Sequence, residues 1–117
     1  MAKTEKTQLP KFNSYSLLGP AEPLHKRAPV HDENGKALSD FMMIFPGLRH
    51  QPQHLVERTI AAIESILSNH ESTVVFAELN LRLSLLWVSI RPIPGIRFEI
   101  ANGIQALVPE ARLVSHL

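Results

Sequence analysis

The sequence predicts an α+β fold of the ferredoxin-like, split βαβ kind (βαββαβ), in which two helices cover one face of an antiparallel sheet. Three observations support it. Two segments repeat apolar residues at the helical period, and the stretch between them alternates apolar with polar residues as a strand does. The third is an echo, because Pro46-Gly47-Leu48-Arg49 precedes the first helical segment and Pro94-Gly95-Ile96-Arg97 precedes the second. The chain therefore reads as two half-repeats, each with one strand-to-helix junction.

The composition is that of one small globular domain. The 117 residues are 44% apolar, which leaves room for a single core. Twelve basic residues oppose eleven acidic ones, so no long-range field attracts nucleic acid or an anionic membrane, and we expect neither as a partner. Cysteine is absent, which excludes disulfides and thiolate metal sites. No apolar run approaches the roughly 18 to 20 residues that span a bilayer, and no signal peptide is evident, so we expect a cytoplasmic protein.

The first part of the chain differs from the rest. Residues 1–26 contain several prolines and show no helical or strand period, so we expect an extended N-terminal arm, with residues 27–117 forming a single domain. The arm has apolar residues for docking on a surface, namely Leu9, Phe12, Tyr15, Leu17 and Leu18. Residues 28–45 predict a hairpin with a type I′ turn at Asn34-Gly35. Its second limb, residues 37–45, supplies an extra hairpin strand that runs into the first core strand.

Helical periodicity defines the two helices. Pro52 suits a first helical turn and Asn69 a helix end, so the first helix is expected over residues 52–69. Its apolar face consists of Val56, Thr59, Ile60, Ile63, Ile66 and Leu67. The second helix is expected from residue 96 to about residue 108, with one face made of Ile96, Ile100, Ile104, Leu107 and Val108. A short strand over residues 112–116 follows.

Residues 73–91 predict a hairpin of two strands. As a helix this stretch would lack a coherent apolar face. Its polar residues alternate strictly with leucines, at Glu78, Asn80, Arg82 and Ser84. One strand of that length would exceed the usual range of roughly 3 to 10 residues, so the chain should fold back. A turn centred on Leu81 pairs Leu79 with Leu83, so that apolar residues meet across the strands, although no glycine supports this turn.

The two Pro-Gly junctions are the candidate binding site. We expect the first and third core strands to be parallel neighbours, which would bring both junctions and two helix N-termini to one edge of the sheet. No carboxylate lies within either junction, so we expect a small anionic ligand there. The candidate residues are Gly47, Arg49, His50, His54, Arg91, Gly95 and Arg97. The alternative is that these arginines pair with acidic side chains such as Glu57 or Glu99.

Signals for metals, RNA or catalysis are weak. His50 and His54 have the spacing of a metal pair, but Pro52 lies between them and no third ligand is evident, so we expect no metal and no cofactor. The third core strand lacks the basic, glycine and aromatic motif of RNA-recognition domains. No nucleophile motif or phosphate loop is visible. We expect a non-catalytic module, and the alternative is a small cofactor-free enzyme that uses His50 or His54 as a general base.

The predicted hairpin register leaves a second apolar face on the sheet. The face assigned to the helices carries Val75, Ala77, Leu79, Leu83, Leu85 and Trp87. The opposite face carries Val74, Phe76, Leu86, Val88 and Ile90. A soluble monomer rarely exposes such a patch, so either the N-terminal arm or a second copy of the sheet should cover it. The arm offers few large apolar groups and two-fold dimers are the commonest oligomers, so we expect a homodimer through this face. The sequence thus predicts a small, self-associating, non-catalytic module that binds a small anion or a protein partner at its paired junctions.

Overall fold

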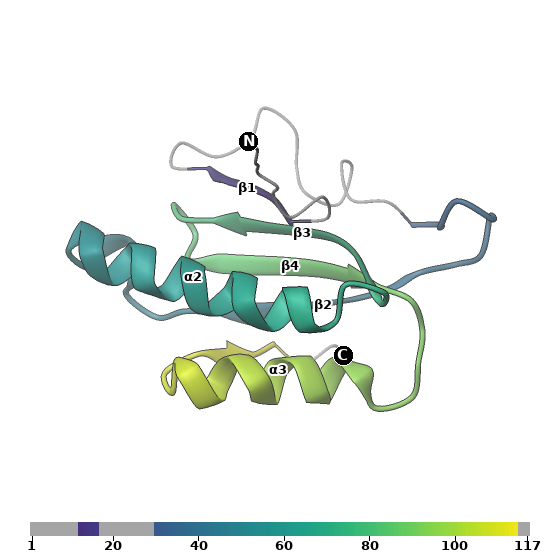
Figure 1. Ribbon diagram of the computed structural model, residues 1–117. Helices are drawn as coiled ribbons and strands as arrows, with labels where there is room; N and C mark the ends of the chain where they lie inside the picture. The colour runs from purple at the N-terminus through teal and green to yellow at the C-terminus, as the bar shows by residue number, and fades with distance from the viewer. Residues whose placement is uncertain (1–11, 17–29, 115–117) are drawn as a thin grey trace, which may run out of the picture.

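The computed structural model describes residues 12–16 and 30–114 of the chain. Two helices lie against an antiparallel sheet (Figure 1), so the predicted α+β class is confirmed. The strands of this sheet are β2 (Ser39–Ile44), β3 (Val74–Asn80), β4 (Leu85–Ile90) and β5 (Arg112–Leu113). The helices are α2 (Gln53–Asn69) and α3 (Ile96–Leu107), and a short 3-10 helix, η1 (Leu48–His50), lies between β2 and α2.

A further strand belongs to the segment that the sequence predicts as an N-terminal arm. β1 (Phe12–Ser16) pairs in parallel with β3 at the edge of the sheet, and the sheet order is β1-β3-β4-β2-β5. The arm residues Leu9, Leu17 and Leu18 lie outside the described residues, as does the end of the predicted last strand, residues 115–117. Part of the predicted arm therefore contributes backbone pairing to the sheet.

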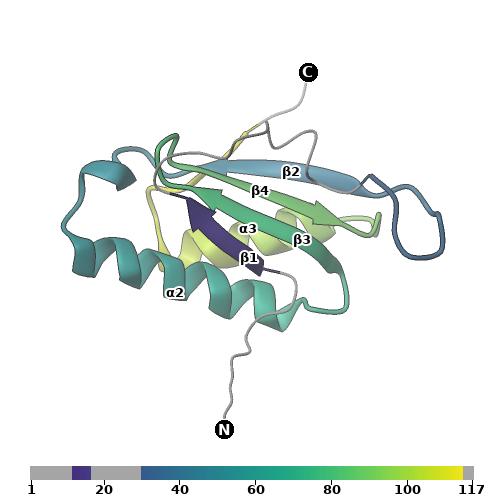
Figure 2. The ribbon, with the colours of Figure 1, turned by 90° about the horizontal axis from the view of Figure 1, so that it is seen from above.

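Both helices lie on the same face of the sheet, as Figures 1 and 2 show from the side and from above. α2 buries Thr59, Ile60, Ile63 and Leu67, all on its predicted apolar face. α3 buries Ile100, Ala101 and Ile104, and these side chains join one core with α2 and the sheet. Leu107 was predicted on the same face but is 54% exposed. The buried face of α3 is centred between Ile104 and Ala101, which rotates Leu107 to its rim.

The β3–β4 hairpin forms where the sequence predicts it, but in a different register. Leu79 pairs with Leu86 rather than with Leu83, so the turn takes in residues 81–84 and the predicted turn centre is wrong. Ser84 has a left-handed φ of 54°, and Oδ1 of Asn80 accepts a hydrogen bond from the Leu83 N–H (3.1 Å). Side-chain hydrogen bonding and one left-handed serine therefore close a turn that has no glycine.

This register turns β4 over, because a shift of three residues is odd. Three of the five residues predicted for a dimer interface, Leu86, Val88 and Ile90, are consequently buried in the core with the helices. A fourth, Val74 of β3, is buried there as well, because the register shifts between Val74 and Phe76 and places them on opposite faces. The fifth, Phe76, packs with Trp87 in a small separate cluster on the other face. That face also carries Asp40, Glu78 and Ser89. It therefore mixes polar with apolar residues, and the prediction of a second, uniformly apolar face is wrong.

β2 and β4 are neighbours, as predicted, but they run antiparallel. The reason is the chain path. The chain crosses from β2 through α2 to β3, which runs in the same direction as β2, and then returns in β4 through a hairpin. Ser39 at the start of β2 therefore pairs with Ile90 at the end of β4, and Ile44 pairs with Leu85. The prediction that the two Pro-Gly junctions lie side by side is wrong, since they follow strands that end at opposite ends of the sheet.

The hairpin before β2 is present, but with another turn. Gly35 has a φ of 80°, whereas Asn34 is not among the described residues with positive φ, so the predicted type I′ pair does not form. The Gly35 N–H donates to the Asp32 carbonyl (3.0 Å) and the Asp32 N–H to the Lys36 carbonyl (2.8 Å), as in a three-residue loop that ends in a left-handed glycine. Oδ1 of Asp32 favours this loop by accepting the N–H groups of Asn34 (2.8 Å) and Lys36 (2.9 Å).

Candidate functional site

The two Pro-Gly sequences form the same turn. In residues 45–48 and 93–96 the last N–H donates to the first carbonyl, at 3.0 Å and 3.1 Å. Gly47 and Gly95 have φ of 75° and 81° with ψ near zero. These are type II turns, in which proline takes the second position and glycine the third. The prediction that both motifs are strand-to-helix junctions is confirmed, and we call residues 45–48 the first turn and residues 93–96 the second turn.

The structure divides the predicted site into two groups. Gly47, Arg49, His50 and His54 lie at the first turn, whereas Arg91, Gly95 and Arg97 lie at the second. The two groups are at opposite ends of the β2–β4 pair, because these strands are antiparallel. One small ligand cannot contact both groups, so each end of the sheet is a separate candidate.

We call the end of the sheet at the first turn the first end, and the end at the second turn the second end. A cleft of about 590 Å³ opens at the first end. It lies between η1, the start of α2 and the β3–β4 turn. Its lining consists of Arg49, Gln51, Gln53, Val56, Glu57, Ile60, Leu81 and Arg82. Ile60 and Leu81 are buried and form an apolar floor, while the charged and amide side chains surround it. Small-molecule sites commonly have volumes of roughly 300 to 1,000 Å³, so the cleft is large enough for a metabolite.

Arg49 is fastened to the β3–β4 turn. Its backbone N–H donates to Oγ of Ser84 (3.3 Å), and its Nη1 donates to the carbonyl oxygen of Arg82 (3.1 Å). A guanidinium has five N–H donors, and this contact involves one of them. Because Arg82 also lines the cleft, the first end presents two arginine side chains to the same space.

The start of α2 adds positive potential to the cleft. Pro52 precedes the helix without a side-chain cap, and the first helical turn contains no acidic residue. The first N–H groups of a helix lack intrahelical acceptors and carry partial positive charge. The acidic residue of the lining is Glu57, whose carboxylate accepts a hydrogen bond from the Gln53 side-chain amide (3.0 Å). The lining therefore contains two arginines and one acidic residue, next to a helix start without an acid in its first turn.

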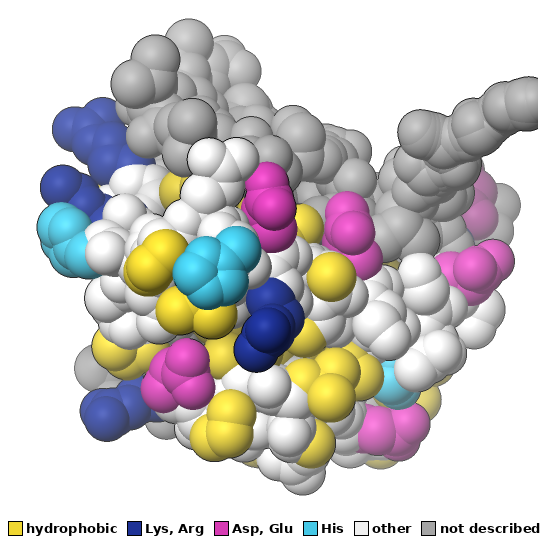
Figure 3. All heavy atoms as spheres, turned by 60° about the vertical axis from the view of Figure 1, so that its left-hand side comes forward, with side chains coloured by type: hydrophobic (Ala, Val, Ile, Leu, Met, Phe, Trp, Pro, Cys, Tyr) yellow, Lys and Arg dark blue, Asp and Glu magenta, His cyan; other side chains and the backbone are white. Residues whose placement is uncertain are grey.

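The histidines predicted at this end lie on the surface. His50 and His54 are both exposed, and neither lines the cleft. Figure 3, which brings this side of the molecule forward, shows histidine and basic side chains together with acidic ones on the surface. Within residues 12–16 and 30–114, no group of three or more His, Cys, Asp or Glu side chains could hold a metal ion. An anion in the cleft would therefore meet arginines rather than imidazoles.

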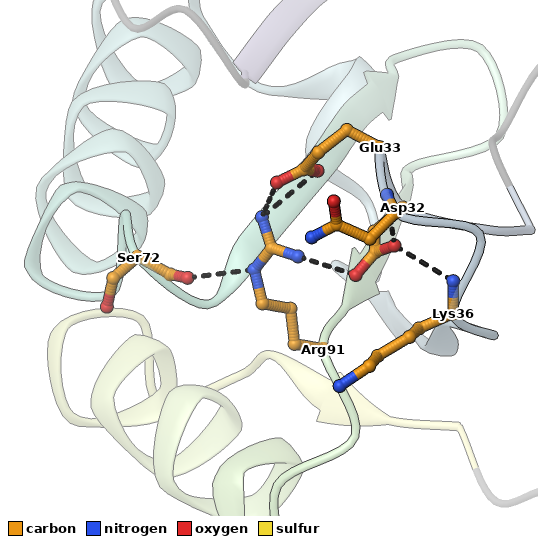
Figure 4. Close-up of polar contacts among 6 residues, drawn as sticks. Asp32, Glu33, Lys36, Ser72 and Arg91 are labelled. Carbon is orange, nitrogen blue, oxygen red and sulfur yellow. Dashed lines mark hydrogen bonds and ion pairs between the residues drawn. The ribbon is translucent and has the colours of Figure 1, made fainter.

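At the second end Arg91 is already paired (Figure 4). Its Nε donates to the Ser72 carbonyl (3.1 Å), its Nη1 to Oδ2 of Asp32 (3.0 Å), and its Nη2 lies 3.3 Å from Oε2 of Glu33. The Asp32 carboxylate accepts a hydrogen bond from the backbone N–H of Lys36, and this bond is the largest of the effects that lower the pKa of Asp32 from its ordinary value of 3.8. Arg91 therefore fastens the hairpin of residues 30–38 to the end of β4, which is the pairing with acidic side chains that the sequence left open.

Arg97 lies beside a hollow of about 450 Å³ at the second end. Its Nη2 donates to Oγ of Ser39 (3.3 Å), at the start of β2. Ile93 and Phe98 line the same hollow and are 48% and 58% exposed. Arg97 therefore lies in a mostly apolar lining, whereas the cleft of Arg49 has charged and amide side chains around an apolar floor.

Sequence reasoning missed the second arginine of the first end. Arg82 reaches the cleft from the β3–β4 turn, and Leu81 lies in the floor. The predicted turn centred on Leu81 already contained both residues, and the opposite directions of β2 and β4 place that turn at the end of the sheet where the first turn lies. The exposed Phe98 was also missed, although it lies outside the predicted apolar face of the second helix.

No helix in the described part of the chain is long and apolar enough to cross a membrane. Comparison of the chain with protein-family models, with curated proteins and with solved structures gave no match. A function is therefore inferred from the chemistry of the two ends of the sheet.

Proposed function

We propose that this protein is a small non-catalytic binding module whose first-end cleft receives a small anionic ligand. The observation that carries the proposal is that Arg49 and Arg82 line one cleft together with the uncapped start of α2. Guanidinium groups bind carboxylates and phosphates through paired N–H donors, and a helix N-terminus favours the same charge. The proposed anion would bind between these groups.

The rest of the lining favours an anion with a carbon body. Val56, Ile60 and Leu81 would contact apolar carbon, while the amides of Gln51 and Gln53 would bind hydroxyl or carbonyl groups. Two guanidinium groups suit a ligand with more than one negative charge better than a monocarboxylate. We therefore propose a phosphorylated or dicarboxylated metabolite as the ligand class.

The same geometry favours a binding module over the alternative, a cofactor-free enzyme with His50 or His54 as general base. A general base must come within roughly 2.6 to 3.2 Å of the proton it removes, directly or through one water. Neither histidine lines the cleft. The cleft offers positioning and charge, which are the requirements of binding.

We also propose the finer features of the architecture. The order β3-β4-β2-β5, in which β4 is antiparallel to both neighbours, supports a ferredoxin-like arrangement. We also propose self-association, although four of the five residues predicted for it lie in the core. Exposed large apolar side chains support it, among them Val30, Ile44, Leu83 and Leu107. Sedimentation equilibrium at micromolar concentration tests it, since a species of 13.1 kDa would contradict a dimer.

A thermal-shift screen of the full chain against phosphorylated and carboxylated metabolites tests the ligand proposal. A ligand that binds only the native state at 100 times its Kd stabilises it by about 2.7 kcal/mol, so a member of the panel should raise the Tm by several degrees. Arg49→Gln should abolish most of that rise, because it removes one guanidinium from the cleft.

The matched control is Arg112→Gln, which removes an exposed arginine of β5 that does not line the cleft and should leave the rise intact. A panel without any stabilising member, or a stabilisation equal in Arg49→Gln and the wild type, would contradict the proposal.

A further inference from the structure

We infer that the second end carries its own binding site, for an apolar carboxylate in which a large apolar group lies next to a single carboxylate. This site is separate from the first-end cleft, and the inference does not rest on the function proposed there. Its ligand class differs because the lining differs. The argument depends on the shape of the hollow, on Arg97 and on the charges around them.

The hollow beside the second turn is apolar almost throughout. Its lining consists of Ser39, Ile90, Pro92, Ile93, Pro94, Gly95, Ile96, Arg97 and Phe98. Two of the large apolar side chains that the described residues expose, Ile93 and Phe98, are in this lining. Covering apolar surface of this kind is favourable by roughly 25 cal/mol per Å². A ligand for the hollow should therefore bring a branched or aromatic group.

Of the described residues that line the hollow, Arg97 alone is charged. Its hydrogen bond to Oγ of Ser39 holds the guanidinium at the junction of β2 and α3, and the other donors of the group extend beyond that bond. In the part of the chain that the structure describes, no ion pair to Arg97 is found, whereas Arg91 is paired with Asp32 and Glu33. A carboxylate beside the apolar group would complement Arg97.

The number of negative charges is limited by the start of α3. Glu99 lies in the first turn of that helix and is hydrogen-bonded to Nε2 of His70 (3.0 Å). This acid offsets the positive N-terminal end of the α3 dipole. The helix at the first end, α2, has no acid in its first turn. Arg97 is thus a single point of attraction, and a monocarboxylate fits it better than a phosphate ester does.

Two sources have this chemistry, namely the C-terminal residue of a peptide and a free apolar acid. N-acetyl-leucine represents the first, 4-methylpentanoate represents the second, and N-acetyl-leucinamide is the matched probe without the charge. The experiment is a titration of the full chain with each probe, followed by two-dimensional amide NMR. We expect the acids to shift the resonances of residues 93 and 95–98, and the amide to bind roughly tenfold more weakly or worse.

Arg97→Gln should remove the difference between the acid and the amide, whereas Arg49→Gln at the first end should leave it unchanged. Phe98→Ser, at a position 58% exposed, provides a second variant and should weaken all three probes equally. Binding of both acids assigns the site to apolar acids in general, and binding of N-acetyl-leucine alone assigns it to peptide termini.

Three results would overturn the inference. One is equal binding of the acid and the amide, and another is an unchanged acid preference in Arg97→Gln. The third is a homodimer, seen by sedimentation, that Phe98→Ser dissociates, because the hollow would then be an interface between copies of the chain. Loss of ligand binding at the first-end cleft in Arg49→Gln leaves this site intact, so the two proposals fail separately.

Discussion

The first and second turns have the same backbone and opposite surroundings. Phe45 begins the first turn and is 1% exposed, whereas Ile93 begins the second turn and is 48% exposed. Leu48, which ends the first turn, is likewise buried, whereas Ile96 is half-buried. Proline and glycine determine the turn, but the elements packed around it determine whether its apolar residues join the core. A repeated motif is therefore evidence of equal conformation and not of equal function.

The charges at the two ends differ for a related reason. At the second end the hairpin of residues 30–38 brings Asp32 and Glu33 to Arg91, and this leaves Arg97 beside an apolar hollow. At the first end Arg49 and Arg82 both line the cleft, where the carboxylate of Glu57 is hydrogen-bonded to a glutamine. The hairpin thus pairs one arginine with two acids at the second end, whereas the lining of the first-end cleft has two arginines and one acid.

The largest expected effect comes from truncating the first residue of each turn. Phe45→Ala should lower the free energy of unfolding by about 3 to 5 kcal/mol, because it leaves a cavity in the core. Ile93→Ala should lower it by about 0.5 kcal/mol or less, because its side chain is half in solvent. Urea denaturation of both variants measures the difference. Equal losses would show that the Ile93 side chain is buried as Phe45 is. The second end would then have no exposed apolar hollow.

The next prediction tests the type II turn that the two ends share. Gly47→Ala and Gly95→Ala should each cost about 1 to 2 kcal/mol, because both glycines have left-handed φ and a Cβ there strains the backbone. Nothing lies within 4 Å of a Cβ added at either position, so contacts should not make the two costs differ. Equilibrium denaturation should therefore give values that agree within about 0.5 kcal/mol. A much larger cost at one glycine would mean that something besides its left-handed φ requires a glycine in that turn.

Features set by local chemistry could be predicted from the sequence. Both helices appear at the predicted positions because apolar residues recur at the helical period over many residues. The two Pro-Gly turns were predictable for the same reason, since proline and glycine act on their own backbone. Opposite directions for β2 and β4 also follow from the predicted element order, although we expected parallel strands. The crossover through α2 lets β3 run in the direction of β2, and the hairpin then makes β4 oppose both.

Features set by one side-chain contact or by distant residues could not be predicted. The β3–β4 register depends on Asn80 and on a left-handed Ser84, and an error of three residues exchanges the two faces of β4. The predicted interface failed for this reason. The pairing of Arg91 with Asp32 joins residues 59 positions apart, and no local pattern reports it. The separation of the two ends has another cause, namely the opposite directions of β2 and β4.

The smallest expected effect is a pH dependence that belongs to the second end. The Lys36 N–H lowers the pKa of Asp32 most, partial desolvation opposes this, and the Asn34 N–H and the Arg91 guanidinium lower the pKa further. Because the pKa is lowered in the folded state, the carboxylate adds stability at pH values above its ordinary pKa of 3.8. That stability is lost as the pH falls through the folded pKa. Asp32→Asn keeps Oδ1 as an acceptor for the turn and removes the charge that faces Arg91.

The free energy of unfolding of Asp32→Asn should therefore lie below that of the wild type by a constant amount above pH 5, and the two curves should converge at lower pH. Glu110→Gln, which removes an exposed carboxylate away from the hairpin, is the control and should not reproduce the convergence. Urea denaturation between pH 2 and pH 7 measures both curves. A gap that stays constant down to pH 2 would show that the aspartate acts through packing or the turn alone, and the charge difference between the two ends would then lie in Glu33 and Arg91.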